Sequence, residues 1–466
     1  MKATLPLVLA LLTVTGCSMI PDYETPERPV PVTIGQATDD AAEPVLPDWQ
    51  HLFPDPHLRA LVESALTHNR DLELALLDVA EARALYGIER SALAPEFNVN
   101  ADGTRQRLPA DLSGNGNSTI SSQYSVGLGM AAYELDLFGR VRSLSESALQ
   151  TYLGTEEAAR SARITLISEV ANAYLLLLAD QQKLAISEET LKAQQASVEL
   201  VQRRYQAGLS SELAVRQAEI ALETARTNRA SFRRQVALDR NALSVLIGGP
   251  VPEIPQTRVM EPAVALLSEV PGGLNASVLT RRPDIRRAEH ALRAANASIG
   301  AARAAFFPAI TLTGSAGTAS ADLSGLFEGG SGAWSFSPGI RVPIFNAGRL
   351  EANLDVAEIR SEKAVIDYEK AIQTAFQEVA DGLAARRYLG QQERAQAALV
   401  RASQRSLNLA EIRFDSGADD YLAVLDARRE LLNARQALVE VKRQKLTNRI
   451  TLYRALGGGE GATAES

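Results

Sequence analysis

Two stretches of the chain carry apolar or small residues at intervals that alternate between three and four positions. In residues 209–247 and 419–456, that spacing places one narrow seam along a helix, so each stretch predicts a helix that packs lengthwise against another. Two seam positions of the first stretch carry charged residues, Arg229 and Asp239. The other seam residues are Val215, Ala218, Leu222, Ala225, Phe232, Val236, Leu243 and Leu246 in the first stretch, and Val424, Ala427, Leu431, Ala434, Leu438 and Val441 in the second.

The two stretches belong to a longer repeat, in which residues 204–249 align with residues 413–458 without a gap. Just before each seam stands a glycine, Gly208 or Gly417, and glycine tolerates the positive φ that a helix end needs. Long segments almost free of proline and glycine precede them at 141–206 and 347–415. The pattern therefore predicts a helical hairpin with its tip at the glycine, and the chain contains that hairpin twice.

Strict alternation of apolar and polar residues predicts two β-hairpins, at about 96–134 and 309–343. The segments Leu112–Ser122 and Ser315–Gly332 are rich in glycine, serine and asparagine, and they are predicted to be the connecting loops. Strands of this length with one apolar face and one face of small polar residues are typical of membrane barrels. The pattern alone leaves open a second interpretation, a pair of soluble hairpins.

Each half of the chain therefore contains a helix, a β-hairpin, a long helix, a tip and a return helix. The first structural repeat is predicted at 57–249 and the second at 276–458, with a linker at 250–275. Four strands cannot close a barrel, and an open sheet in lipid would leave edge groups unpaired. If the strands lie in a membrane, several chains must share one barrel, and three chains would supply twelve strands.

The N-terminus predicts export and lipid attachment. Residues 1–16, with Lys2 followed by an apolar stretch, predict a signal peptide that ends at Gly16. Cys17 then resembles the acylated cysteine of bacterial lipoproteins, which carries diacylglycerol and palmitoyl groups; the alternative is a lone cysteine near an ordinary cleavage site. The proline-rich residues 17–56 predict an extended tether, and residues 459–466 a disordered tail.

Composition excludes several functional classes. The 466-residue chain has a net charge of −8 and a pI near 5.4, so it lacks the basic footprint of a nucleic-acid-binding protein. Its single cysteine allows no internal disulfide, and its four histidines lack metal-ligand spacing. It contains no nucleophile elbow or phosphate-binding loop, so an enzyme is not expected, and no cofactor other than the lipid is expected.

Four further motifs carry a family resemblance: YELDLFGR (Tyr133–Arg140), RRPDIRRAE (Arg281–Glu289), PIFNAGR (Pro343–Arg349) and the paired tips RYQAGLSSEL and RFDSGADDYLAVLDARR. Pro283 and Asp284 in the second of these also suit a plain helix start. In this order, the motifs resemble the outer membrane efflux proteins, the TolC-like channels, and in particular their OprM/NodT-type lipoprotein branch. The resemblance covers nearly all of residues 17–458.

The resemblance implies a mainly α fold with a membrane β part. It would be a homotrimer with a twelve-stranded β-barrel in the bacterial outer membrane, a long periplasmic α-helical barrel and an equatorial region. The implied partners are a periplasmic membrane-fusion adaptor, an inner-membrane RND pump and outer membrane lipid, with no nucleic acid. The implied function is passive conduction of drugs or other small amphiphiles. The alternative from another class is a lipid-anchored trimeric coiled-coil protein with a structural or adhesive role and no transport.

The resemblance also implies where the channel closes. Leu422 and Asp426, one helical turn apart, match the periplasmic gate, whereas spacing alone favours the alternative, a solvated acid on a helix face. Gln217 occupies the position of Asp426 on the first tip, so three acids rather than six would surround the pore. The residues matching the tip latch and the adaptor-docking surface are Arg204, Gly208, Leu213, Arg413, Phe414, Gly417 and Asp419. Hydrogen bonds between neighbouring hairpins are expected at Phe414 and Asp419, although Phe414 has no hydroxyl group.

Overall fold

The computed structural model describes residues 18–35, 48–114, 116–254, 260, 264 and 273–459. The predicted signal peptide, Cys17 and residues 460–466 lie outside the described residues, as does most of the predicted linker. The chain forms two compact units. The first comprises residues 1–27, 78–156 and 287–368, and the second comprises 28–77, 157–286 and 369–466. Each unit combines segments from both sequence repeats.

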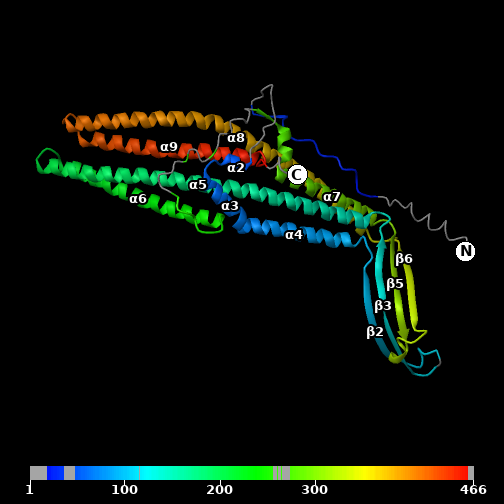
Figure 1. Ribbon diagram of the computed structural model, residues 1–466. Helices are drawn as coiled ribbons and strands as arrows, with labels where there is room; N and C mark the ends of the chain where they lie inside the picture. Colours follow the sequence, from blue (N-terminus) through cyan, green and yellow to red (C-terminus); the bar gives the residue numbers. More distant parts are fainter. Residues whose placement is uncertain are drawn as a thin grey trace. The chain divides into compact units, whose positions relative to one another are not determined.

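The first unit contains an antiparallel four-stranded sheet in the order β2-β3-β5-β6 (Figure 1). Its strands are β2 (Phe97–Leu108), β3 (Thr119–Leu135), β5 (Ala309–Ser320) and β6 (Gly332–Arg341), with a short 3₁₀ turn at Leu323–Gly325 between the last two. The predicted loop boundaries were wrong, because β3 begins and β5 ends inside segments predicted as loops. Thr119 pairs with Leu108 and Ser320 with Tyr124, so the ladder continues through small polar residues that resemble a loop in sequence.

The register gives the sheet two chemically different faces. Residues paired across neighbouring strands point to the same face. One face is largely apolar along the series Val99, Leu128, Ala316 and Trp334, and Trp334 is 80% exposed. The opposite face carries small and polar residues, among them Asn98, Asn100, Thr104, Gln123, Ser125, Thr313, Ser315 and Ser335. In the single chain, the apolar face is therefore uncovered.

A β-bulge in β3 keeps the apolar face continuous. Met130 pairs with Gly314, but the next paired residue is Tyr133, opposite Leu312, and Ala132 between them has φ of 49°. A bulge adds one unpaired residue and so exchanges the faces of all residues that follow it. After the bulge, odd-numbered residues occupy the face that even-numbered residues occupied before it. Tyr133 consequently lies on the same face as Met130.

The motif YELDLFGR forms the turn from β3 into the long helix α5 (Arg140–Gln206). Gly139 adopts φ of 77° at the turn. Glu134 accepts two hydrogen bonds from the Arg140 guanidinium, at 2.8 and 2.6 Å. Asp136 accepts from the Val141 and Arg142 backbone amides and pairs with the Arg142 side chain at 3.1 Å, which caps the helix. The motif therefore fixes the junction between strand and helix.

The motif PIFNAGR forms the turn that leads into α8 (Arg349–Asp415). Ala347 and Gly348 both have positive φ, so the helix begins at Arg349 rather than at the predicted residue 347. The Asn346 side chain accepts a hydrogen bond from the Leu350 amide at 3.1 Å. A side-chain oxygen satisfies an amide that would otherwise lack a partner in the first turn.

The N-terminal segment lies against α7 (Pro283–Ala304) within the first unit. The Asn296 side chain donates to the Pro21 carbonyl at 2.9 Å, and the Arg293 guanidinium lies 4.9 Å from the centre of the Tyr23 ring. A Cβ atom at Gly300 would come within 2.7 Å of Ile20, so the glycine makes room for the segment. The first described residues of the tether are thus packed against this helix.

The second unit is built from helices that run side by side (Figure 1). They include α6 (Glu212–Leu246), α9 (Tyr421–Ala455) and the greater part of α5 and α8, with α2 (Trp49–Leu52), α3 (Pro56–His68) and the 3₁₀ turn Ala276–Arg281. Helix α4 (Arg70–Ser91) begins after a break at Asn69, which separates it from α3. Strand β1 (Thr33–Gly35) pairs with β4 (Gly273–Asn275). An 18-residue window of α5 is apolar enough to cross a membrane, but 61% of the window is buried, as in a core helix.

Arg282 joins three helices at the start of α7. Its guanidinium donates to Asp284 at 2.7 and 3.0 Å, to Glu378 of α8 at 2.7 Å and to the Ala455 carbonyl of α9 at 2.7 Å. Arg282 is buried, so these carboxylates supply the opposite charge that a buried cation needs. The RRPDI motif therefore starts α7 at Pro283, as its composition suggests, and also fixes the helix ends around it.

Two glycines inside α8 provide a matched test of this packing. A Cβ at Gly382 would lie 2.5 Å from the buried Leu452 of α9, whereas Gly390 has open space around it. Gly390→Ala is expected to stabilise the protein by about 0.5–1 kcal/mol, because alanine is the better helix former. Gly382→Ala is expected to destabilise it by about 1–3 kcal/mol through overpacking. Thermal unfolding of both variants measures this, and equal effects would contradict the packing described here.

Candidate functional site: the hairpin tips

Both hairpin tips use the same local chemistry. At the first tip, Gly208 has φ of 73° and the Leu209 amide donates to the Arg204 carbonyl at 2.8 Å. At the second, Gly417 has φ of 76° and the Ala418 amide donates to the Arg413 carbonyl at 2.8 Å. This closure of a helix end requires a residue with positive φ, which explains glycine at both positions. Nothing lies within 4 Å of a Cβ at either glycine, so conformation rather than space selects it.

The return helices begin two or three residues later than predicted, because the tips use those residues as caps. The Ser211 side chain accepts from the Ala214 amide at the start of α6. The Asp420 side chain accepts from the Leu422 and Ala423 amides, at 3.1 and 3.4 Å, at the start of α9. Each tip therefore combines a glycine turn with an N-cap and reverses the chain within a few residues.

A shared apolar cluster packs the two hairpins together behind the tips. It contains residues from all four helices: Val198 and Val201 of α5, Val215 and Ala218 of α6, Leu407 and Phe414 of α8, and Tyr421, Val424, Ala427 and Leu431 of α9. Most of these residues are small or β-branched, which allows the helices to approach closely. The seam predicted from the sequence is buried here, and it joins the hairpins to each other as well as closing each hairpin.

Arg204 connects the two tips directly. Its guanidinium carbon lies 4.4 Å from the centre of the Phe414 ring, and its Nη1 donates to the Phe414 carbonyl at 3.4 Å. The other side of the contact is extended by Tyr421, whose ring centre lies 5.5 Å from that of Phe414. Phe414 thus links the hairpins of one chain through its ring and its backbone carbonyl, neither of which needs the hydroxyl group that it lacks.

Asp419 binds within its own tip. Arg413 donates to its two carboxylate oxygens at 2.6 and 2.8 Å. The hydrogen bonds from Arg413 lower the pKa of Asp419, so the carboxylate stays ionised at neutral pH. Within this chain Asp419 binds Arg413 of its own tip, and a bond from Asp419 to a neighbouring hairpin stays a prediction.

Charged residues of α9 form a series of polar contacts with α5. Arg428 donates to Ser197 and also pairs with Glu411 of α8 at 2.8 Å. Further from the tip, Arg435 pairs with Glu189 at 3.1 Å and Glu440 with Lys183 at 3.2 Å. Sequence analysis did not single out these residues. The signal was the recurrence of charged residues beside the seam, which lies where coiled-coil helices place interhelical ion pairs.

The two predicted gate residues lie on the exposed side of α9. Leu422 is 45% exposed and the Asp426 side chain 51% exposed. Asp426 forms an ion pair with Arg429 of the same helix at 2.9 Å. Neither residue is needed to pack the single chain, and their spacing of four places them on one face. Leu213, at the equivalent position to Leu422, is also exposed.

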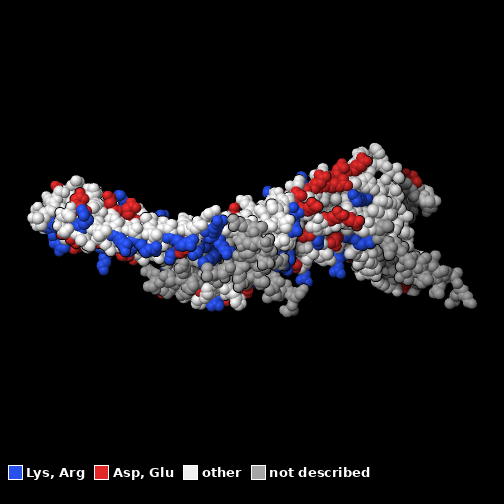
Figure 2. All heavy atoms as spheres, turned by 90° about the horizontal axis from the view of Figure 1, so that it is seen from above, with Lys and Arg blue, Asp and Glu red and all other residues white. Residues whose placement is uncertain are grey.

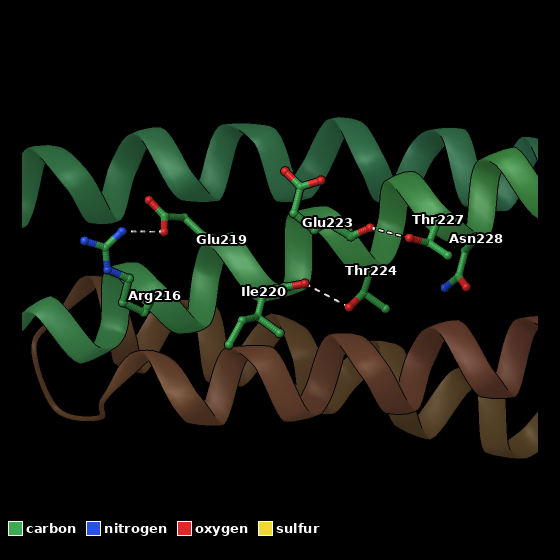
Figure 3. A pocket seen from close by; sticks show the side chains of 7 residues that line it. All are labelled: Arg216, Glu219, Ile220, Glu223, Thr224, Thr227 and Asn228. Carbon is green, nitrogen blue, oxygen red and sulfur yellow. Dashed lines mark hydrogen bonds and ion pairs between the residues drawn. The ribbon is translucent and has the colours of Figure 1, made fainter.

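A groove with a volume of about 550 Å³ lies along α6 (Figure 3). Ile220 and two threonines line it, and each threonine hydroxyl donates to a carbonyl of its own helix. Arg216 already pairs with Glu219 at 2.9 Å. Because its polar groups are satisfied within one helix, this groove offers a ligand little that would orient it.

Helix α8 presents a basic face. Arg387, Arg394, Arg401 and Arg405 follow a spacing of seven, seven and four, which keeps them on one side, and all four are exposed. None of them forms an ion pair with another described residue, in contrast to the arginines of α9. Figure 2 shows basic side chains gathered in a run on one face of the molecule. This face of α8 therefore has unbalanced positive charge.

These features fit one known family. A sequence profile described as "Outer membrane efflux protein" matches residues 61–249 and 274–458, more than half of the chain. The chain belongs to the outer membrane efflux protein family.

Relatives of this efflux protein agree over nearly its full length. The efflux pump outer membrane protein TtgC of Pseudomonas putida is 48% identical over 98% of this chain and 96% of its own length. OprJ of Pseudomonas aeruginosa is 46% identical over 97% of this chain and 95% of its own length. Among solved structures, the outer membrane channel MtrE of Neisseria gonorrhoeae, in its open state, has a TM-score of 0.86 at 40% identity and covers 95% of this chain and 98% of its own.

The protein is therefore an efflux channel of the bacterial outer membrane with a TolC-like fold, as the sequence predicted. Cys17 lies outside the described residues, so its lipidation stays a prediction. The assignment of Leu422 and Asp426 to a gate, and of the tip residues to a latch or docking surface, likewise stays a prediction.

The contact between Arg204 and Phe414 can be measured by a double-mutant cycle. Arg204→Met keeps the aliphatic length and removes the charge, and Phe414→Leu removes the ring but keeps an apolar side chain. We expect a coupling free energy of about 0.5–2 kcal/mol, because a cation over an aromatic face has that range. Chemical unfolding of the wild type, both single variants and the double variant gives the coupling. Additive effects would show that the contact contributes nothing to joining the tips.

Proposed function

We propose that three copies of this chain assemble into one efflux channel. The observation that carries this proposal is the four-stranded sheet, whose edge strands β2 and β6 have no further partner among the described residues and whose apolar face is uncovered. In lipid, each unpaired backbone group costs several kcal/mol, so the edges must be paired by other chains. Three copies give twelve strands, an even number that can close into a membrane barrel. The polar face then lines the lumen.

We propose further that the channel closes at its second tip. The exposed positions of Leu422 and Asp426 on one face of α9, where the packing of the single chain does not need them, support this. Three Leu422 side chains would form an apolar constriction, and three Asp426 carboxylates would disfavour anions near it. The ion pair with Arg429 offers each carboxylate a partner within its own chain, so the ring of acids need not repel itself strongly.

The cargo and the partners are proposed from the relatives. TtgC and SrpC are named as outer membrane proteins of toluene and solvent efflux pumps, and ArpC as that of an antibiotic efflux pump. We propose that this channel conducts small amphiphiles of these kinds and works with a periplasmic adaptor and an inner-membrane RND pump. The exposed tips and the basic face of α8 are the surfaces we assign to the adaptor, whose contacting segment would be acidic.

We also propose that Cys17 carries the lipid anchor, because it follows the predicted signal peptide directly and the nearby residues Ile20, Pro21 and Tyr23 contact α7. The alternative function, a structural or adhesive stalk, has the same long helices but needs no pore. The small and polar residues on one face of the sheet favour a water-filled barrel over a packed anchor.

Conductance in planar bilayers tests the gate. The double variant Leu422→Ser/Asp426→Ala removes both the constriction and the acid, so single-channel current should rise several-fold and cation selectivity should fall. Glu199→Ala, an exposed acid on α5, is the control and should leave the current unchanged. If the double variant conducts the same current as the wild type, the gate lies elsewhere. If none of the three proteins conducts, the structural or adhesive stalk is favoured.

A second experiment tests the orientation of the sheet. Trp334→Asp places a charge on the apolar face, where it should cost up to about 2 kcal/mol in lipid and reduce assembly in the outer membrane. Ser335→Asp places the same charge on the opposite face at the adjacent residue and should be tolerated. Quantifying folded protein in outer membrane fractions compares the two. Equal loss in both variants would contradict the assignment of the apolar face to lipid.

A further inference from the structure

The α5–α6 seam contains a pair of buried carboxyl groups far from the tips. Asp180 of α5 and Asp239 of α6 are each only 4% exposed, and their side chains meet within hydrogen-bonding reach. Asp239 occupies a seam position that otherwise carries apolar residues. Two ionised carboxylates in contact and away from water repel each other strongly, so the position requires an explanation.

The immediate partners of Asp239 do not neutralise it. Its Oδ1 accepts a hydrogen bond from the Gln235 amide at 3.0 Å. Its Oδ2 is buried and has no hydrogen-bond partner among the described residues. Gln235 is neutral, so it satisfies one oxygen without supplying positive charge. The second oxygen is free to carry a proton and donate it to Asp180.

One cation lies beside the pair, and a second carboxylate competes for it. Lys183 Nζ is 3.2 Å from Asp180 Oδ1 and also 3.2 Å from Glu440 Oε2 of α9. Glu440 is in turn bound by Arg443 at 2.6 and 3.2 Å, and these bonds lower its pKa to about 2, so it remains ionised. The cluster thus holds three carboxyl groups and two cations, and it is neutral when one carboxyl group carries a proton.

We propose that Asp180 and Asp239 bind one proton between them, and that this proton controls the link between the two hairpins. With the proton bound, the pair has one negative charge and Lys183 can hold Asp180 and Glu440 at once. When the proton leaves, the pair has two negative charges and draws Lys183 away from Glu440. The ion pair between Lys183 of α5 and Glu440 of α9 then weakens, so low pH favours close association of the two helical hairpins.

The direction of the pH dependence follows from the environment of Asp239. Burial raises its pKa most, and the nearby charge of Asp180 acts in the same direction. The hydrogen bond from Gln235 and the charge of Lys183 oppose the shift, and the net result is a pKa of about 6. A carboxyl group with a pKa raised above its unfolded value adds stability at low pH and loses that contribution as pH rises through about 6. From pH 5 to pH 8, this single proton changes the folding equilibrium constant by about tenfold, with the folded form favoured at pH 5.

This inference concerns the coupling of the hairpins and does not depend on where the channel closes. The groups that act on the pair come from α5 (Lys183), α6 (Gln235) and α9 (Glu440 and Arg443 through Lys183). They all belong to the helical unit, so the assay needs neither a membrane potential nor a partner protein.

The test uses the full-length protein in detergent, with Asp239→Asn as the main variant. Asparagine keeps the size of the side chain and can still accept from Gln235, but it does not titrate. Infrared spectra recorded from pH 5 to pH 8 should show, in the wild type, the band of a buried protonated carboxylic acid that disappears with a midpoint near pH 6. The band should be absent in Asp239→Asn. A wild-type spectrum without this band at pH 5, or an unchanged band in the variant, would overturn the proposal.

Hydrogen exchange tests the consequence for the hairpins. After correction for the intrinsic pH dependence of exchange, amides of α9 around Glu440 should exchange several-fold faster at pH 8 than at pH 5 in the wild type. Asp239→Asn and Asp180→Asn should each remove this difference, and either variant serves if the other does not fold. The variant Lys183→Met retains Asp180 and Asp239 but lacks the ion pair with Glu440. Its α9 amides should therefore exchange fast at both pH values. A difference that persists in both Asn variants would assign the pH effect to other groups.

Discussion

The constraint on which the rest of this structure depends is the pairing of backbone groups at the edges of a four-stranded sheet. The sheet has an apolar face suited to lipid, but strands β2 and β6 end it without partners in the described chain. Soluble proteins can leave such edges in water, whereas a sheet in lipid cannot. Symmetric assembly resolves the conflict, because each chain supplies the partner for the next. The duplication of the chain contributes to this assembly, because each repeat provides one β-hairpin and one helical hairpin.

The helical unit obtains its cohesion from many modest contacts rather than from one large core. Its seams are narrow and rich in alanine and valine, so the helices lie close together and each contact buries little area. Arg428, Arg435 and Lys183 add polar links across the seam, and Arg282 fixes the helix ends. Such an assembly can slide or separate along a seam without unfolding, which suits a channel that must open. The proton shared by Asp180 and Asp239 would adjust one of these links.

Much of this architecture could be predicted from the sequence, because its signals are local and periodic. The alternation of apolar and polar residues predicted the strands, and the spacing of seam residues by three and four positions predicted the return helices. Gly208 and Gly417 predicted the tips. Strand ends were missed where the ladder runs through serine, threonine and glycine, whose composition resembles that of a loop. Arg204 and Phe414 were named as tip residues but not as partners, and the contacts of Arg428 and Lys183 were missed, because charged residues beside a seam do not show which distant helix they pair with. The roles of Leu422 and Asp426 depend on neighbouring copies, so the structure of one chain places them without assigning a function.

The measurement that tests the central claim most directly is the protein mass of the detergent-solubilised particle, determined by light scattering with the detergent contribution subtracted. The 466-residue chain has a mass of 50.1 kDa. We expect a single species with the protein mass of three chains, in which the edge strands of each copy are paired with those of its neighbours. A folded, stable particle containing one chain would contradict it, because that sheet would then tolerate two unpaired edges.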